Sequence, residues 1–246
     1  MPVFFIEPEA LQNDGIAVTG SLAHHLIDSL RVQPGEELWL GLSGGLRFRA
    51  RVLRVETGRL TARILFSSSP PKPSLPAIVL GLGLIKNEHM DWAIQKATEL
   101  GVTRLVPLTT VRSVIKMPDE RIPHRMARWQ TIAHEAAQQS MRWDIPEVTA
   151  PASLEEWCER ERETACRLLL WENPQGRPLG ESLRGKPSPE SIAVGIGPEG
   201  GFDAQEVTQA EQYGFEKVSL GPRILRTETA VLTALAIIQH EWGDVG

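Results

Sequence analysis

A proline-rich stretch divides this chain into two parts. Residues 67–76 read Ser-Ser-Ser-Pro-Pro-Lys-Pro-Ser-Leu-Pro. Proline lacks a backbone N–H and fixes φ, so four prolines in ten residues cannot continue a helix or a central strand. We therefore predict a linker at residues 69–76 between two domains, 1–68 and 77–246, with lengths that are ordinary for folded domains.

The first part has the pattern of a small β-barrel. Its β-branched and alternating apolar runs are separated by glycine turns and by one short helical stretch, which is typical of hairpin-connected strands. We predict strands at residues 15–19, 37–40, 46–55 and 60–66, a helix at 24–30, and turns at 43–45 and 57–58.

Basic residues are concentrated in this first part. The chain as a whole has a formal net charge of −5, yet residues 31–63 hold seven arginines against three glutamates. Because side chains alternate along a strand, Arg47, Arg49 and Arg51 are predicted to share one face of the barrel. That face is either simply solvated or a surface for the phosphates of a nucleic acid.

The second part alternates strands with helices, which favours a parallel α/β sheet. Apolar runs predict strands at residues 77–84, 104–108, 167–171, 192–195 and 217–220. Amphipathic patterns predict helices from Asn87, at 121–140, from Asp203, and at 227–242. Asp203 and Glu206 have the spacing of a capping box.

Two glycine-rich loops follow strands in this part, at residues 195–202 and 220–230. Open α/β sheets bind ligands at the carboxyl ends of their strands, so we expect these loops to lie side by side around a ligand. A dinucleotide is a poor candidate. Gly195, Gly197 and Gly200 have the G-x-G-x-x-G spacing, but the next strand ends in Gly221 and not in the acidic residue that holds a ribose.

The same loops resemble a known family. Residues 195–202 (GIGPEGGF) and 220–230 (LGPRILRTETA), with blocks at 25–31, 90–101 and 134–147, resemble the RsmE family of 16S rRNA (uracil-N3)-methyltransferases in the SPOUT superfamily. The chain departs from the family pattern at two places. Val3 stands where an arginine is usual, and Trp143-Asp144 replaces a small or basic pair.

The resemblance implies a fold and an activity. Residues 1–68 would be a PUA-like, RNA-binding barrel, and residues 77–246 a SPOUT methyltransferase domain with a trefoil knot. The enzyme would transfer a methyl group from S-adenosylmethionine to N3 of a uridine in 16S rRNA of the small ribosomal subunit. It would be a cytoplasmic homodimer, active in rRNA processing.

The resemblance places S-adenosylmethionine at the glycine loops, with a third wall from the end of strand 167–171. The residues implied are Leu170, Trp171, Gly197, Pro198, Glu199, Gly200, Gly201, Leu220, Gly221, Ile224, Leu225, Arg226, Thr229 and Ala230. These glycines also suit tight turns without any ligand, and that interpretation stays open.

Arg226 and Glu228 are the candidate catalytic residues. Arg226 would hold the pyrimidine or stabilise charge on its oxygens, and a salt bridge inside the fold is the alternative. Glu228 stands at a helix start, where a carboxylate is favoured without any chemistry. The RNA-binding candidates are His25, Arg31, Arg47, Arg49, Arg51, Lys96, Gln139 and Arg142.

Other features narrow the function. No apolar run approaches the ~20 residues needed to cross a bilayer, and we expect no secretory signal. Cys158 and Cys166 are predicted to be reduced and structural, and no metal is expected because no Cys/His cluster has zinc spacing. Two alternatives stay open: another SPOUT enzyme acting on tRNA or on a ribose 2′-hydroxyl, and a non-catalytic RNA-binding assembly factor.

Overall fold

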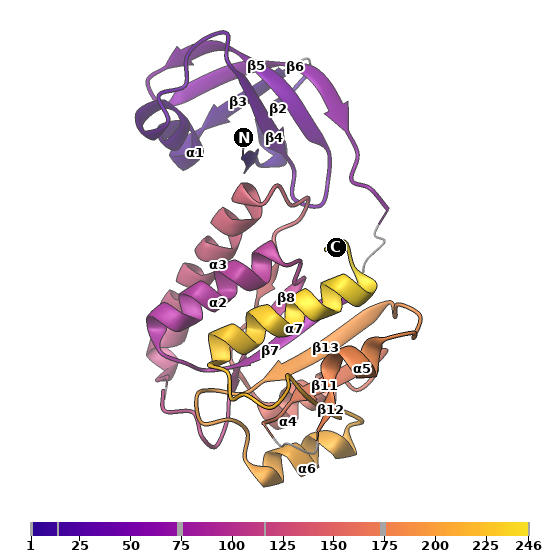
Figure 1. The fold of residues 1–246 in the computed structure, drawn as a ribbon. Helices are drawn as coiled ribbons and strands as arrows, with labels where there is room; N and C mark the ends of the chain where they lie inside the picture. Colours follow the sequence, from indigo (N-terminus) through magenta and orange to yellow (C-terminus); the bar gives the residue numbers. More distant parts are fainter. Residues whose placement is uncertain (1, 14, 73–75, 116, 173–175, 246) are drawn as a thin grey trace. The chain divides into compact units, whose positions relative to one another are not determined.

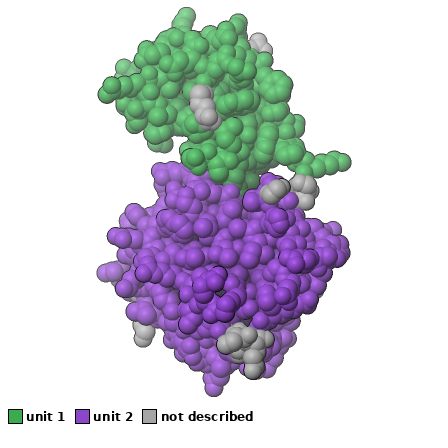
Figure 2. All heavy atoms as spheres, in the orientation of Figure 1, with its two compact units in different colours: residues 1–72, 137–145 green, residues 73–136, 146–246 purple. Residues whose placement is uncertain are grey.

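The computed structural model groups the chain into two compact units, coloured separately in Figure 2. Unit 1 contains Met1–Lys72 together with Ala137–Ile145, and unit 2 contains Pro73–Ala136 and Pro146–Gly246. The return of the chain to unit 1 at residues 137–145 has no signal in the sequence pattern. The residues described are 2–13, 15–72, 76–115, 117–172 and 176–245.

Unit 1 is built on a six-stranded sheet in the order β1-β4-β5-β6-β3-β2, antiparallel except for the β1–β4 pair. Apolar side chains such as Phe4, Leu26, Leu40 and Phe48 form its core. The elements are β1 (Val3–Phe5), η1 (Pro8–Ala10), β2 (Leu11–Gln12), β3 (Gly15–Thr19), α1 (Gly20–His24), η2 (His25–Ser29), β4 (Glu37–Gly41), β5 (Arg47–Glu56) and β6 (Arg59–Ser68).

Segment 137–145 completes unit 1. Ala137 is fully buried in a small cluster with Val3 and Phe5. The backbone N–H of Gly44 donates to the carbonyl of Trp143 at 2.7 Å. The segment therefore shares core contacts with β1 and a backbone hydrogen bond with the turn between β4 and β5.

Unit 2 is built on a parallel sheet in the order β10-β8-β7-β13-β11-β14-β12, with β9 paired to β8 (Figure 1). This confirms the predicted α/β class. The strands are β7 (Ala77–Gly83), β8 (Arg104–Thr109), β9 (Glu147–Val148), β10 (Ala152–Ser153), β11 (Cys166–Leu170), β12 (Arg177–Pro178), β13 (Ser191–Ile196) and β14 (Glu216–Ser219).

Helices cover both faces of this sheet. Alternate residues of β7 separate the two layers: Ile78 and Leu80 pack with α2, α3, α5 and α7, whereas Val79 packs with α4 and α6. Asp203 and Glu206 form the predicted capping box of α6. The helices are α2 (Asn87–Glu99), η3 (Asp119–Arg121), α3 (Ile122–Gln139), α4 (Leu154–Arg160), α5 (Leu179–Leu183), α6 (Ala204–Gln212) and α7 (Thr227–Trp242).

The two glycine loops do not follow neighbouring strands. They follow β13 and β14, which are not neighbours, because β11 lies between them and pairs with both. Three strand ends, and not two, therefore meet where the loops begin. The trefoil knot that the family resemblance implies stays a prediction.

Candidate functional site

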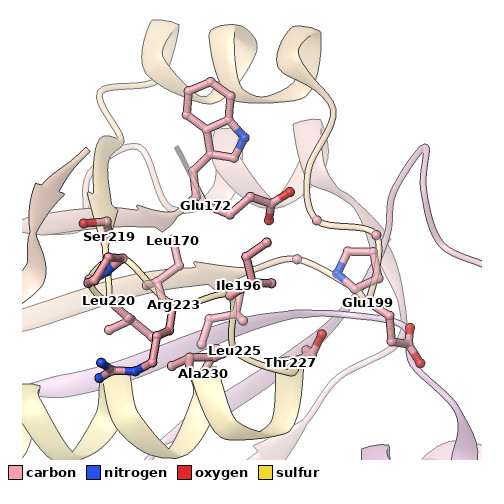
Figure 3. Close-up of a pocket in the computed structure, with 18 residues that line it drawn as sticks. Leu170, Glu172, Ile196, Glu199, Ser219, Leu220, Arg223, Leu225, Thr227 and Ala230 are labelled. Atoms are coloured by element: carbon pink, nitrogen blue, oxygen red, sulfur yellow. The ribbon is translucent and has the colours of Figure 1, made fainter. Parts of the chain in front are cut away.

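A pocket of about 360 Å³ lies at the carboxyl ends of β11, β13 and β14, within unit 2 (Figure 3). That volume lies in the range of pockets for small molecules and cofactors. Its lining residues are Leu170, Trp171, Glu172, Ile196, Gly197, Pro198, Glu199, Gly200, Gly201, Ser219, Leu220, Gly221, Pro222, Arg223, Ile224, Leu225, Thr227 and Ala230.

The pocket combines an apolar surface with a few polar groups. Leu170 and Ile196, at the ends of β11 and β13, are buried. Leu220 and Ala230 pack against the same core. An aromatic ring can lie against such a surface, while the charged lining residues can contact the polar parts of a ligand.

Glycine is required at two positions for these loops to pass close to other groups. A Cβ at Gly83, the last residue of β7, would overlap Pro198 of the first loop, because it would be 2.5 Å from the Cδ of that proline. Gly201 has a φ of +68°, and a Cβ there would be 2.5 Å from the Glu172 carboxylate. A side chain at either position would therefore clash with these neighbouring groups.

A neighbouring loop fixes the first glycine loop in place. Arg112, in the loop after β8, donates to the Gly200 carbonyl at 3.1 Å and forms an ion pair with Asp203 at 3.3 Å. Glu206 is buried and accepts from the backbone N–H groups of Val111 and Asp203, each at 2.8 Å. These contacts hold the 109–113 loop against the pocket wall.

Most of the residues implied for the cofactor line this one pocket. Of the fourteen, only Arg226 and Thr229 are absent from the lining. Sequence reasoning missed Glu172, Ile196, Ser219, Pro222, Arg223 and Thr227. The sequence contains a signal for Glu172, because this residue directly follows the predicted strand 167–171, whose end was expected to form a wall of the pocket.

The two catalytic candidates lie at the start of α7. Arg226 is its N-cap residue, is exposed, and has no ion pair among the described residues. The salt bridge considered as its alternative role is therefore not seen in that part of the chain. The Glu228 carboxylate lies 3.1 Å from His89 Nδ1 on α2, so an ion pair occupies it when His89 is protonated.

The three arginines of β5 do not behave alike. Arg49 and Arg51 are exposed and pair with Glu37 at 2.6 and 2.8 Å. The hydrogen bond from Arg51 lowers the pKa of Glu37. Arg47 is only 8% exposed, and its Nη2 donates to the carbonyls of Met141 and Arg142, both at 2.9 Å. Arg47 is therefore occupied within unit 1, unlike its two neighbours.

Trp143 and Asp144, the pair that departs from the family pattern, take part in contacts within the same segment. The Arg47 guanidinium carbon lies 3.9 Å from the centre of the Trp143 ring, a cation–π geometry. Asp144 accepts a hydrogen bond from Arg142 at 2.8 Å. Both unusual residues thus stabilise the local structure of segment 137–145.

The remaining RNA-binding candidates divide between the units. His25, Arg31 and Gln139 are exposed residues of unit 1. Lys96 belongs to α2 in unit 2, where its ammonium group contacts both carboxylate oxygens of Glu99, at 2.7 and 2.9 Å. Lys96 therefore belongs to a different structural unit from His25, Arg31 and Gln139.

Comparison with known proteins decides the family. Residues 71–239 match the RNA methyltransferase domain family, and residues 18–65 match the RNA methyltransferase PUA domain. The chain belongs to the RsmE family of RNA methyltransferases. This confirms the resemblance that the two glycine loops indicated.

Individual relatives agree along most of the chain. Ribosomal RNA small subunit methyltransferase E of Bacillus subtilis is 29% identical, over 92% of this chain and 90% of its own. The Synechocystis protein of the same name is 34% identical, over 95% and 75%. The Neisseria gonorrhoeae protein of the same name, solved bound to S-adenosyl methionine, is 34% identical over both full chains, with a TM-score of 0.87.

No helix in the described residues is long and apolar enough to cross a membrane.

Cys158 and Cys166 are free thiols in unit 2, and Cys158 is buried. Burial raises the pKa of Cys158 from 9.0 to about 12, so its thiol stays protonated at neutral pH.

Proposed function

We propose that this protein methylates N3 of a uridine in 16S rRNA of the small ribosomal subunit, with S-adenosylmethionine as the methyl donor. The observation that carries the proposal is the pocket of about 360 Å³ at three adjacent strand ends, in a chain 34% identical to a relative solved with S-adenosyl methionine. We further propose that it acts in the cytoplasm as a homodimer.

The residues present fit this donor. Apolar side chains at Leu170, Ile196 and Leu225 offer a surface for the adenine ring. The space that a Cβ would fill at Gly201 is taken by a carboxylate of the wall, so this loop lies close against its neighbour. The donor supplies an electrophilic methyl group, and the chain must hold it in line with the attacking nitrogen.

Arg226 is our candidate for stabilising the uracil. Loss of the N3 proton leaves negative charge that spreads to the two ring carbonyl oxygens. A planar guanidinium can donate to such oxygens, and its permanent charge favours the anion. Arg226 suits this role because it follows the pocket residue Leu225 directly and is exposed without an ion pair among the described residues.

Glu228 is the second candidate catalytic residue. It is the second residue of α7, two positions after Arg226, and its side chain is only partly exposed. Nδ1 of His89 on α2 lies 3.1 Å from its carboxylate. We propose that this pair helps to accept or hold the N3 proton.

Unit 1 is proposed to bind the RNA. Arg49 and Arg51 present guanidinium groups at the surface of β5, and Arg31, with a φ of 54°, is an exposed residue two positions after η2 in the same unit. We retain residues 1–68 as the RNA-binding domain, 69–76 as linker and 77–246 as the methyltransferase domain. N3 of a paired uracil is blocked, so the target must be unpaired or flipped out.

The test is methyl transfer in vitro. Small subunits from a strain that lacks this protein are incubated with it and with labelled S-adenosylmethionine, and the rRNA nucleosides are separated. We expect label in N3-methyluridine. Label in a ribose-methylated nucleoside, or in tRNA alone, would contradict the proposal, and so would binding of RNA without any transfer.

A further inference from the structure

We propose that Glu172 accepts hydrogen bonds from the ribose hydroxyls of the bound nucleoside. This inference rests on the proposed function, since it takes S-adenosylmethionine as the ligand of the pocket. It adds a specificity residue that the glycine-loop motifs do not contain.

Glu172 lies between the end of β11 and the first glycine loop. It lies two residues beyond the end of β11, the strand between those that carry the two glycine loops. Its carboxylate lies against Gly201 of the first loop, since a Cβ at Gly201 would be 2.5 Å from each of its oxygens. Only a glycine leaves room for the carboxylate at this position.

Two other acceptor or hydroxyl side chains of the pocket, those of Ser219 and Glu199, already have partners in the protein. Ser219 Oγ donates to the Gly176 carbonyl at 3.0 Å, and Glu199 accepts from the backbone N–H of Lys86 at 3.3 Å. In Figure 3 the carboxylates of Glu172 and Glu199 point in different directions. Among the described residues, Glu172 has no hydrogen bond and no ion pair, although it lines the pocket.

A ribose diol matches these features. A carboxylate is an acceptor with two oxygens, and two vicinal hydroxyls can each donate to one of them. An acidic residue at a strand end beside a glycine turn holds ribose hydroxyls in dinucleotide sites for the same reason. In this chain the acidic residue follows β11, whereas the strand after the first glycine loop, β14, leads into Gly221.

The experiment measures binding of three ligands by calorimetry. All three ligands contain the adenosine ribose. S-adenosylmethionine and S-adenosylhomocysteine also carry an amino acid group, which 5′-methylthioadenosine lacks. Glu172→Gln should weaken all three by a similar factor, roughly tenfold, because an amide accepts from hydroxyls less strongly than a carboxylate. Glu163→Gln, at a side chain that is 88% exposed, is the matched control and should change none.

Each other result overturns the proposal. A loss for the first two ligands only would assign Glu172 to the ammonium group. Unchanged affinities in a folded Glu172→Gln protein would remove it from the site. Failure of the unmodified protein to bind any of the three would refute the proposed function itself. Thermal melting of each variant, with Glu172→Asp as a second variant, separates lost binding from lost folding.

Discussion

Replacing Arg47 with alanine should destabilise unit 1 far more than replacing either neighbouring arginine. Arg47 is 8% exposed, donates to two carbonyls at 2.9 Å, and lies 3.9 Å from the centre of the Trp143 ring. A hydrogen bond from a charged donor contributes about 1.5–3 kcal/mol, and a desolvated cation–π contact about 2 kcal/mol.

These contributions do not add in full, because water can reach the two carbonyls once the side chain is removed. We therefore expect Arg47→Ala to lower the free energy of unfolding by about 3 kcal/mol. Arg49→Ala removes an exposed ion pair with Glu37, and such pairs are worth about 0–1 kcal/mol. It is the matched control on the same strand.

The assay is urea denaturation combined with hydrogen exchange of peptides from segment 137–145. Arg47→Ala should lower the midpoint and speed exchange in that segment, while Arg49→Ala should do neither. RNA affinity should show the opposite pattern, with the salt dependence reduced by Arg49→Ala. A change below about 0.5 kcal/mol for Arg47→Ala would show that its buried contacts do not hold the segment.

Three further predictions concern unit 2. Glu206→Ala removes the acceptor of two loop N–H groups, so it should cost about 2 kcal/mol in urea melts and weaken S-adenosylmethionine binding severalfold; unchanged affinity would show that the 109–113 loop does not shape the pocket. The unfolded Cys158 thiol ionises from about pH 9, before the folded one at about 12, so the free energy of unfolding should fall as pH rises through that window. Cys158→Ala should reduce that slope, and an equal slope would assign it to other groups. Arg226→Lys should lower methyl transfer strongly while calorimetric affinity for the donor changes little, and full turnover would end its catalytic role.

Local signals predicted those parts of the fold that depend on neighbouring residues. The capping pair of Asp203 and Glu206 and the apolar pattern of 227–242 gave α6 and α7, because both effects act within one or two turns. The helix predicted from Asn87 is α2, which begins at that residue with Lys86 as its N-cap and without a side-chain cap. The glycine loops gave most of the pocket for a similar reason, since each motif follows its own strand.

Features that depend on distant parts of the chain could not be predicted in this way. The position of β11 between β13 and β14 is a matter of strand order, and no local pattern encodes it. The burial of Arg47 depends on Trp143, almost a hundred residues later, so the period-two pattern of β5 gave three equivalent arginines. Glu172 lies outside both glycine motifs and joins the pocket only through its contact with Gly201, about thirty residues later, so no local pattern marks it.

The most direct test of the proposed function is nucleoside mass spectrometry of 16S rRNA from a strain that lacks this protein. The proposed function predicts that one N3-methyluridine disappears, returns when the protein is supplied, and stays absent when the Arg226→Ala variant is supplied at equal abundance. An unchanged content of N3-methyluridine, together with loss of a different methylated nucleoside, would contradict it.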